Sequence, residues 1–332
     1  YIYQTLFCAF LSLFVACDDL EDKSTSTTID GNITETGTAE IYILSEGLFN
    51  LNNSSLAKYS FKSNKLVKNY FKDLNKRGLG DTANDIVLYG SKLYIVVNVS
   101  STIEVIDFQT GISIKQIPMF TDNGSSRQPR HIAFYENKAY VCSFDGTVAR
   151  IDTTSLQIES FTKAGRNPEN ICVKNKKLYV SNSGGLDYSE GLGVWDMKSE
   201  QLVGTWNRLL NSRVSGLRIW DDRTVLVATD GEGIFRMDIV NPDITSFIQT
   251  DFENDNSIRT NRIADVFVDD QKLIWVADYP EGVSMIDVES PDDYKWYRAR
   301  SGDSHSLTNN RVNAVLHDSD GDVWFATDPV SY

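Results

Sequence analysis

The chain has three histidines, and histidine can act as an acid, a base or a metal ligand near neutral pH. His131, His305 and His317 do not lie in an HExxH motif, a Cys/His metal spacing or a Ser-His-Asp pattern. His305 and His317 stand in turn-like segments and are expected to be solvated. Arg130 and His131 form the one pair that could supply a base. The sequence shows no catalytic motif, so we expect a non-enzyme without a metal or cofactor.

Two short segments resemble ligand-binding loops but are better explained as turns. Asp318-Ser319-Asp320-Gly321-Asp322 begins like a calcium loop, yet Pro329 occupies the place of the required Glu. We expect its carboxylates to bond backbone amides between two strands. Gly231-Glu232-Gly233 fits a hairpin turn and does not open a helix, so it is not a phosphate loop.

A repeated unit accounts for most of the chain. Each unit has an apolar strand, an aromatic-led strand and a strand that ends in Asp. The closing residues Asp107, Asp152, Asp196, Asp238 and Asp287 are 45, 44, 42 and 49 positions apart. This period matches a four-stranded propeller blade. One small twisted sheet cannot cover its own apolar faces, whereas a radial array covers both faces of every sheet.

The sequence therefore predicts an all-β fold, a β-propeller of about seven blades of four antiparallel strands. The second strands of the units are marked by Tyr42, Tyr94, Tyr140, Tyr179, Leu226, Trp275 and Trp324. The first unit lacks a clear inner strand, and the last supplies one and then stops. The two ends could together complete a seventh blade, or the ring could be incomplete because the chain is a fragment or a hybrid. We expect no amphipathic helix after residue 16.

The residues just before each inner strand should surround the central funnel of such a ring. They are mixed in charge and rich in hydrogen-bonding groups, which suits a polar small molecule or a glycan fragment. The alternative is that they satisfy turn backbones and pair with one another. The predicted ligand-binding residues are Asn84, Asp85, Arg130, His131, Glu169, Asn170, Arg213, Arg262, Asp265, Arg311 and Asn313.

The two halves of the repeat resemble different families. Residues 39–206, with blade openings Arg127–Ile132 and Asn167–Ile171, resemble the YncE-like or YVTN-type propeller lipoproteins. Residues 213–332 resemble the two-component regulator propeller repeat, chiefly through Asn310–Val315 and Asp318–Thr327. The first resemblance implies a surface lipoprotein, such as those that capture cobalamin. The second implies the periplasmic sensor region of a hybrid histidine kinase.

The N-terminal segment predicts export. The apolar run Leu6–Val15 is too short to cross a bilayer and fits a signal-peptide core. Phe14-Val15-Ala16-Cys17 resembles a lipobox, which implies lipidation of Cys17 after removal of residues 1–16. An acidic tract follows, and Ser24–Thr38 is polar enough for a disordered linker, so residues 17–38 should tether a propeller over residues 39–332. The predicted location is the outer membrane or cell surface, with a periplasm-facing anchor as the alternative.

Charge and cysteine content narrow the possible partners. A net charge of −14 argues against nucleic acid and against membrane contact other than through the anchor. Cys142 and Cys172 lie in apolar strand runs and are expected to be buried free thiols. The sequence thus favours an anchored propeller that binds a corrinoid-like or glycan ligand, with an outer-membrane transporter or a signalling protein as partner. The alternatives are a truncated sensor region of a hybrid two-component protein and a propeller enzyme of the lyase or quinoprotein kind.

Overall fold

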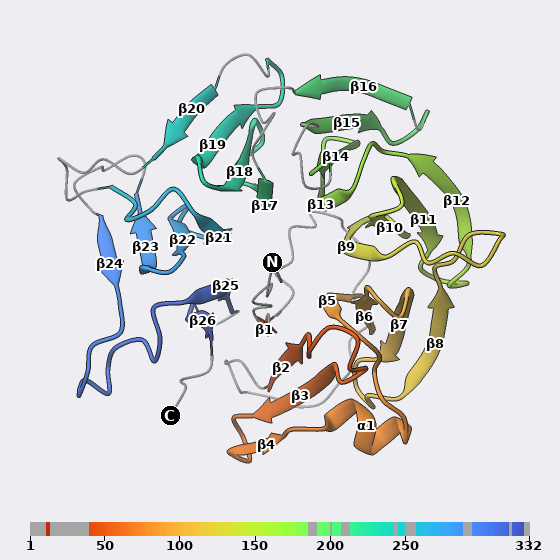
Figure 1. Ribbon diagram of the computed structural model, residues 1–332, viewed down its shortest axis with the longest axis horizontal. Coiled ribbons are helices and arrows are strands. Elements are labelled where there is room, and N and C mark those ends of the chain that lie inside the picture. Colours follow the sequence, from red (N-terminus) through yellow and green to blue (C-terminus); the bar gives the residue numbers. More distant parts are fainter. Residues whose placement is uncertain are drawn as a thin grey trace, which may run out of the picture.

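The computed structural model describes residues 11–13, 40–184, 191–199, 201–206, 213–241, 245–249, 257–287, 294–318 and 321–328. Within these residues the chain is almost entirely β-structure, and its antiparallel sheets are arranged radially around a central axis (Figure 1). The fold is an all-β propeller, as the repeat predicts. No helix in this part of the chain is long and apolar enough to cross a membrane.

Consecutive strands build each sheet, and the sheets follow one another around the ring in chain order (Figure 1). The first sheet contains β1 (Leu11–Leu13), β2 (Glu40–Ser45), β3 (Ser55–Ser60) and β4 (Lys65–Val67). The second contains β5 (Ala83–Tyr89), β6 (Lys92–Val97), β7 (Thr102–Asp107) and β8 (Ser113–Pro118). The third contains β9 (Pro129–Tyr135), β10 (Lys138–Ser143), β11 (Thr147–Asp152) and β12 (Ile158–Lys163).

The second half of the ring continues this pattern. The fourth sheet contains β13 (Pro168–Lys174), β14 (Lys177–Asn182), β15 (Leu192–Asp196) and β16 (Gln201–Trp206). The fifth contains β17 (Arg213–Ile219), β18 (Thr224–Asp230), β19 (Gly233–Asp238) and β20 (Thr245–Ile248). The sixth contains β21 (Ile263–Val268), β22 (Ile274–Asp278), β23 (Gly282–Ile286) and β24 (Lys295–Tyr297). The seventh contains β25 (Val312–His317) and β26 (Val323–Thr327).

The predicted count of seven four-stranded blades is wrong. Among the described residues, six sheets have four strands and the seventh has two. The two ends also do not merge into one blade, because β2 takes β1 as its inner neighbour, with Leu44 opposite Ser12. The place beside β2 is therefore filled, and β25–β26 forms a separate sheet. The strand β1 comes from the run predicted as a signal-peptide core, and that signal remains a prediction.

The apolar core is divided among the contacts between neighbouring sheets. One cluster of buried side chains lies between each consecutive pair, from the first and second sheets to the sixth and seventh. A smaller cluster of Ile41, Leu316 and Ala326 joins the seventh sheet to the first. Each sheet thus buries both faces against its neighbours, which explains why the second strands are apolar without alternation.

Short polar turns connect the strands as the closing aspartates predict. Asp107 accepts hydrogen bonds from the backbone N–H and the hydroxyl of Thr110, at 2.8 and 2.7 Å. Asp152 accepts from the N–H groups of Thr154 and Ser155. The hydrogen bonds from Thr110 lower the pKa of Asp107, and the bond from the Thr110 hydroxyl has the largest effect. The same turn recurs at Asp196 and Asp238.

Later sheets carry a second kind of aspartate turn. Asp318 accepts the backbone N–H of Asp322 at 3.0 Å and the indole N–H of Trp324 at 2.7 Å. Asp269 bonds Trp275 in the same way, at 2.8 Å. The carboxylates therefore position backbone and an indole, and no metal-binding group of three or more His, Cys, Asp or Glu occurs among the residues with described positions.

One short helix departs from the sequence expectation. The helix α1 (Tyr70–Asn75) connects the first and second sheets and buries Tyr70 and Phe71 against both. Arg77 follows it and pairs with the fully buried carboxylate of Glu104 at 2.7 Å. Six residues make fewer than two turns, which is too short for a helical period to be visible in the sequence.

Candidate functional site

The opening of the central funnel, called the mouth from here on, is the region around the starts of the inner strands. A bulge recurs there at the start of six inner strands. In β5 the register passes from Ala83 opposite Val97 to Asp85 opposite Val96, which leaves Asn84 as an extra residue. Equivalent register shifts occur near the starts of β9, β13, β17, β21 and β25. A bulge bends the strand and redirects its side chains. The predicted mouth residues thus lie at or beside irregular positions of the ladder.

Three of the predicted ligand-binding residues hold neighbouring blades together. The carboxylate of Asp85 accepts the N–H of Ile86 at 2.9 Å and the N–H of Ile132, in the next inner strand, at 3.0 Å. Asp265 repeats this arrangement with Val266 at 2.9 Å and Val315 at 3.2 Å. Both side chains are almost fully buried. These bonds make the two aspartates bridges between inner strands.

Asn170 occupies the same position in the fourth sheet and has a similar role. Its side-chain amide donates to the carbonyl of Val214, in the next inner strand, at 3.4 Å. Its backbone N–H donates to the hydroxyl of Ser181 at 2.9 Å. The third residue of a bulged strand therefore serves to connect blades in the second, fourth and sixth sheets.

Burial affects the pKa of the aspartates that form these bridges. Desolvation raises the pKa of Asp265, although the Arg218 guanidinium, 2.9 Å from its carboxylate, acts in the opposite direction. The two backbone N–H donors also favour the ionised form. Removing such an acceptor would leave two buried donors without a partner, which is more costly than losing an exposed hydrogen bond.

A buried ion pair lies between the third and fourth sheets at the mouth. The Arg130 guanidinium donates to Glu169 at 2.6 Å, and their side chains are 15% and 8% exposed. The guanidinium also lies over the ring of Phe144, 4.7 Å from its centre. Burial opposes the charge of Arg130, but the Glu169 carboxylate and then Glu46 offset it, so the pKa of the guanidinium is raised. A fixed positive charge therefore stands at the mouth.

His131 lies beside this pair and is more accessible. Its Nδ1 is 3.2 Å from Asp85, and 28% of its side chain is exposed. Because Asp85 is already held by two backbone N–H groups, it fixes the orientation of the imidazole. Asn84 lies near the same carboxylate in the chain and donates to Glu46 at 3.3 Å. The structure thus brings Asn84, Asp85, Arg130, His131 and Glu169 to one part of the mouth.

The remaining predicted residues lie elsewhere on the mouth face. Arg262 is 57% exposed and pairs with Asp230 at 3.0 Å. Arg311 is also exposed and lies 3.7 Å from Asp328, which accepts a hydrogen bond from Asn313 at 2.6 Å. For Arg213 the structure gives only the backbone, which lies opposite Asp230. Cys17 lies outside the described residues.

A second set of mouth residues was not predicted. These residues stand four positions after the residue that marks each second strand, which is aromatic except at Leu226, and each lies where that strand ends beside the start of the inner strand. Glu46 contacts Asn84, Phe144 lies under Arg130, and Asp328 contacts Asn313. The repeat spacing could have revealed them, because the fixed interval from the aromatic residue places them at one height: Glu46, Asn98, Phe144, Ser183, Asp230, Tyr279 and Asp328.

A further buried carboxylic acid lies at the end of β22. Asp278 is fully buried and accepts a hydrogen bond from the Ser284 hydroxyl, which itself accepts one from Tyr294 at 2.6 Å. Burial raises the pKa of Asp278 to about 7. This carboxyl group therefore keeps its proton to a higher pH than an exposed aspartate does.

The two described cysteines are free thiols, as predicted. Cys142 is buried beside Arg130, and Cys172 is partly buried against the fifth sheet. Burial raises the pKa of each thiol to about 12, so neither is ionised at neutral pH.

Two protein families match different parts of the chain, and the first match ends close to residues 206–213, where the two resemblances in the sequence meet. The family described as "Domain of unknown function (DUF5074)" matches residues 39–214. The family described as "Two component regulator propeller" matches residues 306–328, which confirms that resemblance for the last repeat. No curated protein matches the chain.

Solved structures share the fold at low sequence identity. Two structures of the extracellular domain of BT4673 from B. thetaiotaomicron, described as a proposed one component or hybrid two component system, align with TM-scores of 0.64 and 0.63 at 15% identity. They cover 87% of this chain and 36% and 35% of those chains, so this chain spans about a third of their length. Kuenenia stuttgartiensis hydrazine synthase aligns with a TM-score of 0.53 at 17% identity, over 71% of this chain and 70% of that chain. These likenesses show a propeller and nothing more specific.

The bridging role of Asp85 predicts a loss of stability on truncation. Asp85→Ala should lower the free energy of unfolding by about 3 kcal/mol, because two buried N–H groups lose their acceptor. The matched control is Asp270→Ala at an exposed position, expected to change stability by less than about 0.5 kcal/mol. Chemical denaturation followed by circular dichroism measures both. Equal effects in the two variants would contradict the bridging role.

The raised pKa of Asp278 predicts a pH dependence with a definite sign. Its native pKa, about 7, lies above the ordinary value of 3.8, so the native state keeps a proton that the unfolded state releases. The stabilising contribution is complete below about pH 4 and is lost as the pH rises through 7. Asp278→Asn should therefore lose less stability than the wild type between pH 4 and 8. Parallel pH profiles would refute the shift.

Proposed function

We propose that this propeller binds a polar ligand at its mouth, outside the inner membrane. The chain belongs to the DUF5074 family, whose model matches residues 39–214. The observation that carries the proposal is the group formed by Arg130, Glu169, His131 and Asn84. It combines a buried fixed cation, a carboxylate and two groups that can both donate and accept hydrogen bonds. Such convergence of a few polar groups at a mouth is typical of small-molecule sites.

The bridges described above refine the set of ligand contacts. Asp85, Asn170 and Asp265 use their side chains between blades, so they support the site without offering free surface. Arg262 and Arg311 are exposed and stand apart from the Arg130 pair. We infer that the ligand contacts Asn84, Arg130, His131 and Glu169. A corrinoid or a glycan fragment has the required hydrogen-bonding groups.

We further propose that the chain is exported and lipid-anchored at Cys17, as a YncE-like lipoprotein of the outer membrane or cell surface. The lipobox-like residues before Cys17 and the polar stretch after it support this location. The likeness to an extracellular domain agrees with an extracytoplasmic fold. An outer-membrane transporter or a signalling protein would then be the partner.

A second candidate function is the sensor region of a hybrid two-component protein. The regulator propeller match over residues 306–328 and the likeness to the BT4673 extracellular domain favour it. The sequence of the gene on either side of this segment distinguishes the two. A membrane helix and a kinase encoded in the same frame would support the sensor, and a stop codon directly after the propeller would support the lipoprotein.

We propose a binding role in preference to catalysis. His131, the candidate base, directs Nδ1 toward a carboxylate already held by two backbone N–H groups. The hydrazine synthase likeness concerns the fold. Hydrolytic or lyase activity that disappeared in Arg130→Ala and His131→Ala would overturn this preference.

Ligand binding at the mouth predicts a selective loss on mutation. The full chain is screened by thermal shift against corrinoids, glycan fragments and divalent metals, because a ligand well above its Kd raises stability by mass action. Arg130→Ala combined with Glu169→Ala, which leaves no charge buried alone, should weaken binding at least about tenfold, or 1.4 kcal/mol.

The matched control for this experiment is Arg223→Ala. Arg223 pairs with Asp238 at the opposite end of its sheet from the mouth, so its removal should leave binding unchanged. A ligand that bound the double variant as tightly as the wild type would place the site elsewhere. No shift with any ligand would favour a scaffold role.

Lipidation predicts a change in mass and in partitioning. The full-length gene product, expressed in a Gram-negative host, should carry acyl chains at Cys17 and enter the detergent phase. Cys17→Ser should stay in the aqueous phase, whereas the control Cys8→Ser should still be lipidated because Cys8 lies in the segment that is removed. Intact-protein mass spectrometry decides the matter, and an unmodified wild-type chain would refute the anchor.

A further inference from the structure

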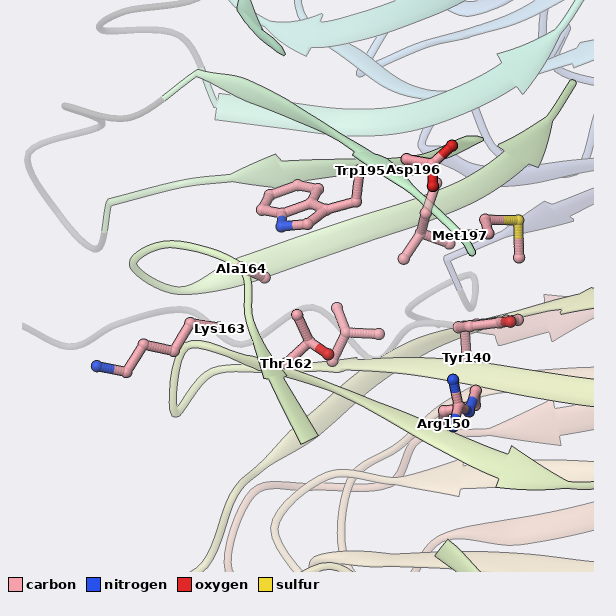
Figure 2. Close-up of a pocket in the computed structure, with 10 residues that line it drawn as sticks. Tyr140, Arg150, Thr162, Lys163, Ala164, Trp195, Asp196 and Met197 are labelled. Carbon is pink, nitrogen blue, oxygen red and sulfur yellow. The ribbon is translucent and has the colours of Figure 1, made fainter. Parts of the chain in front are cut away.

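Two tryptophans of the propeller differ in their surroundings. Trp195 is buried between the third and fourth sheets, together with Tyr140 and Met197 (Figure 2). The space left among these side chains is about 20 Å³, which is room for about one water molecule. Trp296, in β24 at the outer edge of the sixth sheet, is partly exposed and lies against two arginines. The contact between the sheets is therefore filled, whereas the surroundings of Trp296 are open to solvent.

Two arginines share the ring of Trp296. The guanidinium carbon of Arg259 lies 4.5 Å from the centre of the ring, and that of Arg298 lies 4.7 Å from it. The indole N–H donates to the carbonyl of Glu281 at 3.0 Å, which fixes the plane of the ring. Because an aromatic face attracts cations, Trp296 holds two positive side chains close together. Without an anion these two charges repel each other.

The segments that meet at this ring are basic, although the chain as a whole has a net charge of −14. Ser257–Arg262 carries two arginines, and Tyr294–Arg300 carries a lysine and two arginines. Neither segment contains an acidic residue. Both lie toward the mouth end of the sixth sheet, because β21 begins at Ile263 and β24 ends at Tyr297, opposite the start of β23. A local excess of positive charge therefore forms at this corner of the ring.

Two of these arginines are compensated by carboxylates. Arg262 pairs with Asp230 of the fifth sheet at 3.0 Å. The backbone N–H of Arg259 donates to the buried carboxylate of Asp278 at 3.5 Å, and the Arg259 charge acts on the same carboxylate. Both positive charges are thus partly offset within the protein.

Arg298 and Arg300 keep their charge at the surface. Both are exposed, and neither forms an ion pair with a carboxylate in the part of the chain that the structure describes. Glu281, which contacts the indole through its carbonyl, adds one negative charge against these two. A guanidinium that is positioned on a ring beside a second one, with no carboxylate of its own, is suited to bind an anion from solution.

We propose that Arg298 and Arg259, aligned by Trp296, bind an oxoanion, either a carboxylate or a sulfate group. The planar guanidinium presents its N–H donors in a fixed fork that matches the oxygens of such a group. A free polycarboxylate and the acidic group of a glycan both offer this chemistry. The site lies across the ring from β9, which carries Arg130, so it does not depend on the function proposed there (Figure 1).

The test titrates the full chain with a galacturonate tetrasaccharide, tricarballylate and maltotetraose by calorimetry. Saturable binding of the acidic tetrasaccharide is expected, and added salt should weaken it because exposed charges are screened. The neutral maltotetraose should bind at least about tenfold more weakly. Comparable binding of tricarballylate would assign the site to a free anion, and binding of the tetrasaccharide alone would assign it to an acidic glycan.

Three variants separate a built site from a general attraction of charge. Arg298→Gln removes an exposed charge, so it should keep the melting temperature and weaken binding at least about fivefold. Trp296→Leu keeps both positive charges but removes the ring that aligns them, and it should weaken binding to a similar extent. Arg223→Gln is the matched control, because it removes an equal charge from an exposed arginine at the opposite end of its sheet from the mouth, and it should bind as the wild type does.

Absence of saturable binding of both acidic probes would overturn the proposal. So would binding that survives Arg298→Gln, or an equal loss in Arg223→Gln. The double variant Arg130→Ala with Glu169→Ala should bind the acidic probes unchanged. The failure of this site is therefore distinguishable from the failure of the site at the mouth.

Discussion

The structure depends on the burial of two apolar faces by every small sheet. No sheet of four short strands can cover both faces alone, and the buried clusters lie between sheets instead of within them. A ring satisfies this constraint for all sheets at once. The contact between the seventh and first sheets has the smallest buried cluster, in keeping with a seventh sheet of only two described strands.

The same constraint determines what the mouth can do. Inner strands approach one another near the axis, where a backbone N–H directed away from its own sheet needs an acceptor. Asp85 and Asp265 supply that acceptor across the contact between blades. The mouth therefore contains two classes of polar residue, one that connects the ring and one, represented by Arg130 and His131, that leaves polar surface at the opening. Charge at the opening is maintained because the Glu169 carboxylate offsets the burial of Arg130.

The sequence was sufficient for the fold class because its period is carried by several features at once. Aromatic residues, closing aspartates and apolar runs recur together, and each reflects a local requirement of one blade. The make-up of the first and last sheets was not predictable in the same way. The neighbour of β2 is decided by Leu11–Leu13, a run that composition alone cannot distinguish from an export signal. The six-residue helix was missed because it is shorter than the period that would reveal it.

The candidate site was predicted in part for a similar reason. Position in the repeat located Asn84, Arg130 and Glu169 at the mouth, but it could not separate a bridging carboxylate from a free one. That distinction depends on a backbone group of the next blade, about 47 residues away in the case of Asp85 and Ile132. Glu46 and Phe144 stand at a fixed interval in the repeat but were not predicted, because they lie at the ends of the second strands and the predicted residues all lie in or directly before the inner strands.

Hydrogen exchange at the amides of Ile132 and Val315 tests the central claim most directly. Both N–H groups donate to an aspartate of the preceding blade, at 3.0 and 3.2 Å. If these bonds connect the ring, the two amides exchange only through global unfolding, as slowly as the amides of the buried second strands. Exchange at the rate of the exposed turns would show that the blades are not joined at these positions, and the assignment of Asp85 and Asp265 would be wrong.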